Sequence, residues 1–119
     1  MSDFPITIFH NPQCGTSRNT LALLCERGFE PRVVEYVKEG WAKDQLKDLF
    51  ARMGVRPRQM MRTKGALAEE LGLLDESVGD EAILDAMVAN PILVERPVVV
   101  TPKGVTLARP ADKVLDVLP

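Results

Sequence analysis

The sequence predicts an α/β fold in which a mixed central sheet of about four strands is flanked by helices. Three observations lead to this prediction. A β-branched segment near the start is followed by an amphipathic helical pattern and a second β-rich segment. Helical patterns then fill a stretch at about residues 42–90, and the C-terminal part carries two short β-branched runs, a tight turn and a last helical pattern.

The size and composition are those of a single globular domain, here residues 1–119, with 45% hydrophobic and 27% charged side chains. The net charge of -2 gives no general attraction to a polyanion, so no nucleic-acid partner is expected. No apolar run is long enough to span a bilayer, and residues 1–5 lack a basic and apolar leader. We therefore expect no membrane partner and a cytoplasmic location.

The first predicted elements surround a cysteine. Residues 6–10 form an expected buried strand, which the turn-forming pair Asn11-Pro12 ends. A helix is predicted from residue 16 or 17 to residue 27, and residues 32–37 predict the next strand. Because a right-handed crossover joins these two strands, they should be parallel neighbours.

The middle of the chain is expected to be helical. Residues 43–53 carry apolar side chains on one face with a glycine behind them, and residues 80–89 form a second such pattern that stops before Pro91. Between them, residues 57–72 predict one or two short helical pieces.

The C-terminal part predicts a β-hairpin and a helix. Strands are expected at residues 98–101 and 105–108 around a turn at residues 102–104, and a helix at residues 111–118. The short turn makes these two strands antiparallel, so the sheet is mixed. This order of elements is the outline of the thioredoxin-like fold.

Cys14 is the candidate nucleophile because it lies at the turn from the first strand to the first helix. Free backbone N–H groups and the helix dipole favour a thiolate there, whereas an ordinary cysteine is only about 3% ionised at neutral pH. Arg18 in the first helical turn, and His10 if it is protonated, would add positive charge nearby. The alternative is that Cys14 fills a core, but the Pro, Gly, Ser and Asn residues around it are unusual in a packed core.

The second cysteine is not expected to assist the first. Cys25 lies eleven positions along the same predicted helix, about 16 Å from Cys14, so the two cannot form a disulfide. Its helical phase matches Leu21, which predicts a core position for Cys25. Ser17 occupies the place where a C-x-x-C dithiol has its second thiol, so a reaction that oxidises Cys14 must use a thiol from another molecule. Position 20 is Thr and not the Arg of the C-x5-R phosphate loop, so the low-molecular-weight tyrosine phosphatases are disfavoured as a function class.

Nearly the whole chain resembles the glutaredoxin-coupled arsenate reductases. The similar segments are His10-Asn-Pro-Gln-Cys-Gly-Thr-Ser-Arg-Asn-Thr20, Met60-Met-Arg62, Glu69-Glu-Leu-Gly-Leu73, the run from Asn90 to Thr101, and Leu107-Ala-Arg-Pro110. The resemblance implies a thioredoxin-like fold with a helical insertion at about residues 42–90, a catalytic Cys14, and three substrate-binding arginines: Arg62, Arg96 and Arg109. It also implies a cis peptide bond between Arg96 and Pro97.

By the same resemblance the protein is an oxidoreductase of arsenic detoxification that holds no metal and no resident cofactor. The Cys14 thiolate attacks arsenate and forms a covalent adduct, glutathione attacks this adduct as co-substrate, and glutaredoxin clears the mixed disulfide that remains. Guanidinium groups suit this chemistry because they bind the oxygens of a tetrahedral oxyanion with paired hydrogen bonds. The expected partners are arsenate, glutathione and glutaredoxin.

Each residue near the candidate nucleophile also has a structural alternative. Ser17 either hydrogen-bonds the sulfur or caps the helix, and His10 either tunes Cys14 or only ends a strand. Arg62 belongs to a basic run that would by itself more often be a solvated face, formed by Arg56, Arg58, Arg62 and Lys64. Arg96 and Arg109 each precede a proline at a strand boundary, where they could instead discourage pairing between sheet edges.

Three other functions remain open from the sequence. The first is a non-enzymatic relative of the same fold: either a thiol-sensing regulator that binds RNA polymerase, although its usual C-x-x-C switch is broken by Ser17, or an inactive protein that only binds partners. The second is a reductase of this family with a different substrate. The third is a monothiol glutaredoxin, since Cys14-Gly-Thr-Ser17 is similar to the C-G-x-S loops that bind iron–sulfur clusters with glutathione. Against the third, a charged residue, Glu95, precedes the Arg96-Pro97 pair, where a glutathione-binding backbone is usual.

Overall fold

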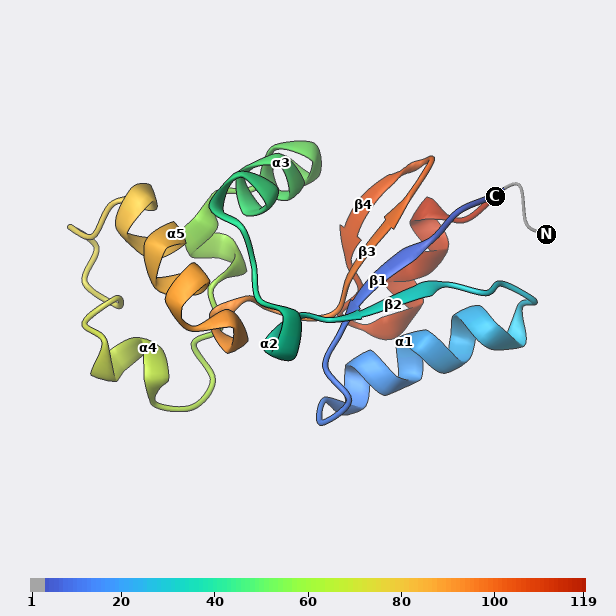
Figure 1. Ribbon diagram of the computed structural model, residues 1–119, viewed down its shortest axis with the longest axis horizontal. Helices are drawn as coiled ribbons and strands as arrows, with labels where there is room; N and C mark the ends of the chain where they lie inside the picture. The colour runs from blue at the N-terminus through green and yellow to red at the C-terminus, as the bar shows by residue number, and fades with distance from the viewer. Residues whose placement is uncertain (1–3) are drawn as a thin grey trace. The chain divides into compact units, whose positions relative to one another are not determined.

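The strands of the sheet come from the two ends of the chain, and a helical segment separates them (Figure 1). The computed structural model describes residues 4–119. In chain order the elements are β1 (Thr7–His10), α1 (Gly15–Glu26), β2 (Arg32–Glu35), α2 (Tyr36–Glu39), α3 (Lys43–Met53), η1 (Pro57–Met60), α4 (Leu67–Glu70), α5 (Asp80–Ala89), η2 (Pro91–Leu93), β3 (Val98–Thr101), β4 (Gly104–Leu107) and η3 (Ala111–Val117). The expectation that the chain starts without a leader rests partly on residues 1–3, which lie outside the described residues.

The described chain divides into two units. The first unit holds residues 4–39 and 96–119, and it contains the whole sheet together with α1, α2 and η3. The second unit holds residues 40–95, which form the helices from α3 to η2.

The sheet of the first unit has the strand order β2-β1-β3-β4. β1 is parallel to β2, with Phe9 opposite Val34, and antiparallel to β3, with Phe9 opposite Val98. β3 and β4 pair as an antiparallel hairpin. The predicted mixed four-stranded sheet is therefore confirmed, and it has the arrangement of the thioredoxin-like fold.

One face of the sheet carries the hydrophobic core of the first unit. Ile8 of β1 and Val99 of β3 are fully buried, and they pack in one cluster with Leu24 of α1 and Val114 of η3. Burying a side chain of this size contributes about 1.5–3 kcal/mol to folding. Because Leu24 and Val114 both serve this core, α1 is held against the sheet, and with it the turn that carries Cys14.

The second unit is built on α3 and α5, whose predicted bounds, residues 43–53 and 80–89, are confirmed. The buried residues are Leu46, Leu49 and Phe50 of α3 and Ile83, Leu84 and Met87 of α5. α3 ends at Gly54, which adopts the left-handed conformation at φ 71° that closes a helix and that glycine enters without steric cost.

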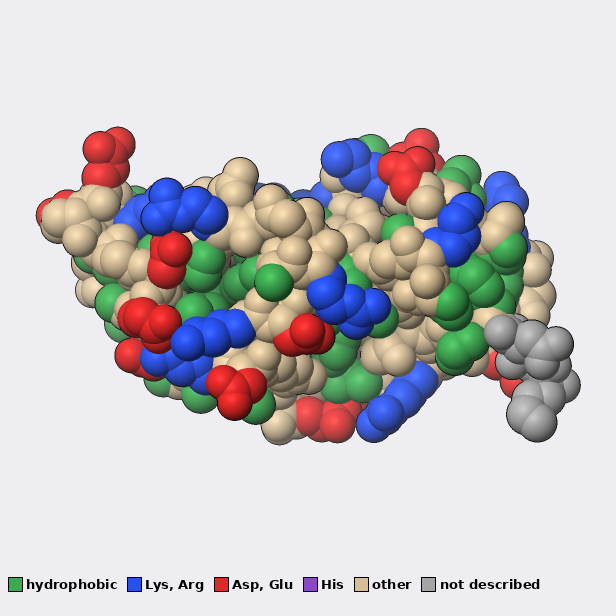
Figure 2. Space-filling view, turned by 90° about the horizontal axis from the view of Figure 1, so that it is seen from above, with side chains coloured by type: hydrophobic (Ala, Val, Ile, Leu, Met, Phe, Trp, Pro, Cys, Tyr) green, Lys and Arg blue, Asp and Glu red, His purple; other side chains and the backbone are tan. Residues whose placement is uncertain are grey.

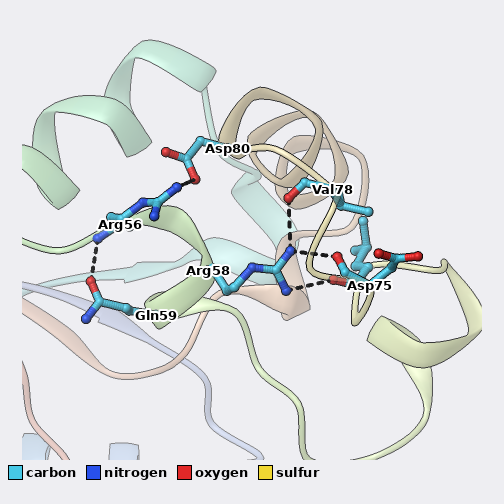
Figure 3. A network of polar contacts seen from close by, with 7 residues as sticks. Arg56, Arg58, Gln59, Asp75, Val78 and Asp80 are labelled. Atoms are coloured by element: carbon cyan, nitrogen blue, oxygen red, sulfur yellow. Dashed lines mark hydrogen bonds and ion pairs between the residues drawn. The ribbon is translucent and has the colours of Figure 1, made fainter.

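Two arginines of the basic run are bound within the second unit (Figure 3). Arg58 donates hydrogen bonds to the carbonyl oxygens of Leu73, Asp75 and Val78 at 2.9–3.1 Å. Arg56 forms an ion pair with Asp80 at 3.1 Å. These contacts hold the irregular segment between α4 and α5, so these two cations serve the structure of the unit.

Several predicted boundaries differ from the structure. β2 ends at Glu35 and not at residue 37, because Tyr36 starts the helical turn α2 and buries its ring, which is only 1% exposed. α1 starts at Gly15, one or two residues earlier than expected. The hairpin turn consists of Pro102 and Lys103 alone, since Gly104 already pairs with Thr101.

The surface carries both signs of charge. On the face drawn in Figure 2, basic and acidic side chains are interspersed. Within the described part of the chain, every helix falls short of the length and apolar character needed to cross a membrane.

Candidate active site around Cys14

Cys14 is the residue immediately before α1, with an extended backbone at φ -97° and ψ 122°. A tight turn places it there: the Cys14 N–H donates to the Asn11 carbonyl oxygen at 3.0 Å, and the Gln13 N–H donates to Asn11 Oδ1 at 3.0 Å. From the sequence, Asn11 was expected only to end a strand. Its Asn-Pro pairing was the available sign that the side chain would also hold the turn.

The helix end beside the sulfur is electropositive. The first turn of α1 contains no acidic residue, so no carboxylate offsets the positive end of the helix dipole next to Cys14. The backbone N–H of Ser17 also lowers the pKa of the Cys14 thiol. This group belongs to the main chain of Ser17, the residue that the sequence offered as a hydrogen-bond partner of the sulfur.

Two arginines from the other end of the chain also reach the sulfur. Arg109, just after β4, donates from Nη1 to Cys14 Sγ at 3.6 Å, and the guanidinium of Arg96, just before β3, lowers the pKa of the same thiol. The same Nη1 of Arg109 donates to the Arg96 carbonyl oxygen at 3.0 Å. The Arg96–Pro97 bond is cis, as the resemblance implied, and so is the Arg109–Pro110 bond.

These groups lower the pKa of the Cys14 thiol. Burial alone would raise the pKa, since it disfavours the charged form, but the Ser17 N–H and the guanidinium groups of Arg96 and Arg109 outweigh it. Cys14 is half-buried and its thiol is free. The arrangement therefore supplies a stabilised thiolate with guanidinium donors beside it.

His10 and Ser17 form a buried pair behind the turn. His10 Nδ1 lies 2.6 Å from Ser17 Oγ, and the Asn11 N–H donates to the same Oγ at 3.1 Å. Burial lowers the pKa of His10, with Arg18 lowering it further and Glu35 opposing, which favours the neutral imidazole at pH 7. His10 thus supports the turn without adding the positive charge that the sequence analysis considered.

The Ser17 hydroxyl is engaged with His10 and Asn11 and does not cap α1, so of the two roles considered from the sequence only the effect on the sulfur remains, and it comes from the backbone N–H. Ser17 is the third residue of α1 and is fully buried, whereas a capping residue precedes the helix.

Arg18 supports the turn from the outside. Its Nη1 donates to the Pro12 carbonyl oxygen at 2.8 Å, in an exposed position. Its charge lowers the pKa of His10, and it is not among the groups that lower the pKa of Cys14.

Arg62 belongs to the second unit. Its backbone is fixed there, since its N–H donates to the Leu93 carbonyl oxygen at 2.6 Å, next to the bridge between Met61 and Val94. The structure thus brings Arg96 and Arg109 to Cys14 within the first unit, and it places Arg62 on a segment of the second unit.

The prediction that Cys25 fills a core is wrong, because Cys25 is exposed. The buried face of α1 runs through Ser17, Thr20 and Leu24. Leu21 itself is only half-buried, so a residue with the same helical phase, such as Cys25, can lie on the solvent side of α1. Both cysteines are free thiols.

No group of three or more potential metal-ligating His, Cys, Asp or Glu side chains occurs among residues 4–119. The chemistry available at Cys14 is that of a thiolate, main-chain donors and two guanidinium groups.

Known proteins share this arrangement of sequence and fold. Residues 9–117 match the sequence model of the ArsC family. The chain is 57% identical to arsenate reductase ArsI1 of Synechocystis sp., over 99% of this chain and 82% of that protein. It is 52% identical to an arsenate reductase of Rhizobium meliloti, over 96% of this chain and 81% of that protein. An arsenate reductase structure from Vibrio cholerae superposes with a TM-score of 0.94 at 39% identity, covering 98% of this chain and 100% of that chain. The chain belongs to the ArsC family.

Proposed function

We propose that the protein reduces arsenate to arsenite, with Cys14 as nucleophile and with electrons from glutathione and glutaredoxin. The single observation that carries this proposal is the sulfur of Cys14, which accepts a hydrogen bond from Arg109 and whose pKa is lowered by the guanidinium groups of Arg96 and Arg109. A thiolate supplies the nucleophile, and the guanidinium groups suit the oxygens of a tetrahedral oxyanion. The names of the curated relatives support arsenate as that oxyanion.

The first step is substitution at arsenic. The Cys14 thiolate forms a sulfur–arsenic(V) bond while one oxygen leaves as hydroxide or water after taking up a proton. In this step Arg96 and Arg109, which lower the pKa of the Cys14 thiol, bind the oxygens of the anion once the sulfur shares its negative charge. By the family resemblance Arg62 is the third guanidinium that binds it.

The second step transfers two electrons. A glutathione thiolate attacks the Cys14 sulfur, the sulfur–arsenic bond breaks, and its electron pair reduces arsenic(V) to arsenic(III), which leaves as arsenite. Cys14 and glutathione are then joined as a mixed disulfide. A glutaredoxin thiol attacks the glutathione sulfur and releases the Cys14 thiolate for the next cycle.

The need for outside thiols follows from the cysteines of this chain. Ser17 occupies the place of a resolving cysteine in a C-x-x-C motif, and Cys25 lies on the solvent side of α1 with a free thiol. A cysteine near the far end of a helix of 12 residues cannot reach Cys14 while the helix persists. Glutathione and reduced glutaredoxin are held in the cytoplasm, where we propose that the protein acts.

The test is arsenate-dependent oxidation of NADPH in a coupled assay with glutathione, glutathione reductase and glutaredoxin. Wild type and Cys25→Ser should both be active, and Cys14→Ser should have no activity above background. A parallel assay with thioredoxin and thioredoxin reductase in place of the glutathione system should give no turnover. Activity in Cys14→Ser would refute the nucleophile, and turnover with thioredoxin alone would refute the electron donor.

A further inference from the structure

A second candidate binding site lies within the second unit, next to the segment that carries Arg62. A cavity of about 200 Å³ is lined by residues of two segments. One segment supplies Arg62, Lys64, Gly65, Ala66 and Leu67, and the other supplies Ile92 and Leu93.

The cavity has a fixed frame. The Arg62 N–H donates to the Leu93 carbonyl oxygen at 2.6 Å, and the Glu95 N–H donates to the Met60 carbonyl oxygen at 2.8 Å. With the bridge between Met61 and Val94, these bonds tie the two lining segments together at the end where Arg62 and Leu93 lie. Main-chain hydrogen bonds therefore hold the walls in place before a ligand binds.

The charges in the cavity are available to a ligand. The basic run contains four cations, of which Arg56 and Arg58 are bound by Asp80 and by carbonyl oxygens of the unit. Among residues 4–119, the side chains of Arg62 and Lys64 have no hydrogen-bond or ion-pair partner. Of the four cations of the basic run, the two that line the cavity are thus the two whose side chains form no hydrogen bond or ion pair within the described residues.

The remaining walls are apolar. Leu67 and Ile92 contribute hydrocarbon surface, and Ile92 is 40% exposed although it is a large hydrophobic residue. A small inorganic oxyanion would use the cations but not this surface. An organic anion with a hydrocarbon part uses both, and the cavity volume suits one end of a short peptide rather than the whole of it.

We propose that this cavity binds a carboxylate-bearing end of the glutathione co-substrate, with Lys64 as the residue that recognises the carboxylate. The proposal rests on the proposed function, because that function supplies the tripeptide thiol and makes Arg62 a ligand of arsenate. Lys64 then binds the thiol co-substrate and Arg62 binds the oxyanion, although the two residues lie only two positions apart on the same segment.

The kinetic test uses Lys64→Ala and Lys64→Glu in the coupled assay. Loss of one exposed charge pair should raise the KM for glutathione about two- to fivefold in Lys64→Ala, and reversal should raise it further. The KM for arsenate should stay unchanged, and Lys64→Arg should restore most of the affinity for glutathione. Lys113→Ala, which removes one exposed positive charge from η3, is the control for the change in net charge.

The binding test does not need turnover. S-methylglutathione cannot react as a thiol, and it should shift the backbone amide resonances of Gly65, Ala66 and Leu67 in the full-length Cys14→Ser variant. Adding Lys64→Glu to that variant should abolish these shifts. Glutathione ethyl ester has one of the two carboxylates blocked. If the KM for this ester is the same in wild type and Lys64→Glu, the blocked carboxylate is the one that Lys64 binds.

The outcomes separate the two proposals. Arsenate reduction with a KM for glutathione that is the same in wild type and Lys64→Glu would overturn the glutathione site and leave the proposed function standing. Absence of arsenate reduction together with the amide shifts would overturn the function and leave a site for a carboxylate peptide. Amide shifts that persist in the Lys64→Glu background would refute Lys64 as the recognising residue.

Discussion

Arg109 Nη1 lies 3.6 Å from Cys14 Sγ, although 95 positions separate the two residues in the chain. The contact is possible because β4 ends beside β3 and because Arg109 also donates to the Arg96 carbonyl oxygen at 3.0 Å. One guanidinium nitrogen thus connects the sulfur to the segment that carries the second arginine.

Arg109→Ala should reduce the reactivity of Cys14. Loss of the guanidinium raises the pKa of the thiol, so alkylation by iodoacetamide at pH 7 should slow by about two- to tenfold. The measurement is the pH dependence of alkylation in a Cys25→Ser background, which isolates Cys14. Arg18→Ala is the matched control, because Arg18 bonds to the Pro12 carbonyl oxygen, and it should have the smaller effect. Equal slowing in both variants would contradict the assignment.

His10 should make folding stability depend on pH. Burial is the main cause that holds its pKa below the ordinary value of 6.5, so the unfolded chain takes up a proton near that pH while the folded chain does not. The free energy of unfolding should therefore decrease as the pH falls below about 6.5, and His10→Gln should lack this contribution. Urea unfolding of both proteins at about pH 7.5 and about pH 5.5 gives the comparison. A difference between the two that does not shrink on acidification would refute the neutral buried imidazole.

Ser17→Ala should destabilise the protein by about 1–3 kcal/mol, because it leaves the buried His10 Nδ1 and Asn11 N–H without their shared partner. The main-chain N–H at position 17 remains, so the pKa of Cys14 should change less than in Arg109→Ala. Denaturant unfolding and alkylation kinetics measure the two effects. Ser77→Ala, which removes an exposed hydroxyl bonded to Asp75, serves as control and should cost less.

Arg58→Ala should loosen the segment between α4 and α5. Three carbonyl oxygens lose a charged donor, and we expect a cost of about 1–3 kcal/mol with faster hydrogen exchange in residues 71–79. Arg56→Ala breaks only the exposed ion pair with Asp80 and should cost less than about 1 kcal/mol. Equal protection of residues 71–79 in wild type and Arg58→Ala would contradict the proposed support.

The sequence was most informative where one local pattern decides the structure. The helices at 43–53 and 80–89 match their predictions because apolar periodicity and a following glycine or proline act within a few residues. The predicted end of β2 at residue 37 was wrong because the burial of Tyr36 depends on the tertiary fold, which local β propensity does not report. The prediction that Cys25 lies on the buried side of α1 was wrong for the same reason, since packing against the sheet decides which face of the helix is covered.

The candidate site was predictable only in part. The position of Cys14 before a helix follows from the strand, turn and helix signals around it. The approach of Arg96 and Arg109 does not follow from any local signal, and only the family resemblance indicated it. The Ser17 main-chain donor and the carbonyl oxygen of Arg96 have no signature at all, because every residue type carries these groups.

The solvent position of Cys25 has a practical consequence for handling the protein. An accessible thiol on the outer side of a helix can pair with the same thiol of a second molecule when reductant is withdrawn. Preparations aged in air should therefore accumulate covalent dimers that vanish on a reducing gel, and the Cys25→Ser variant should stay at the mass of one chain. Titrations that count reactive sulfhydryls will otherwise report a background that has nothing to do with turnover.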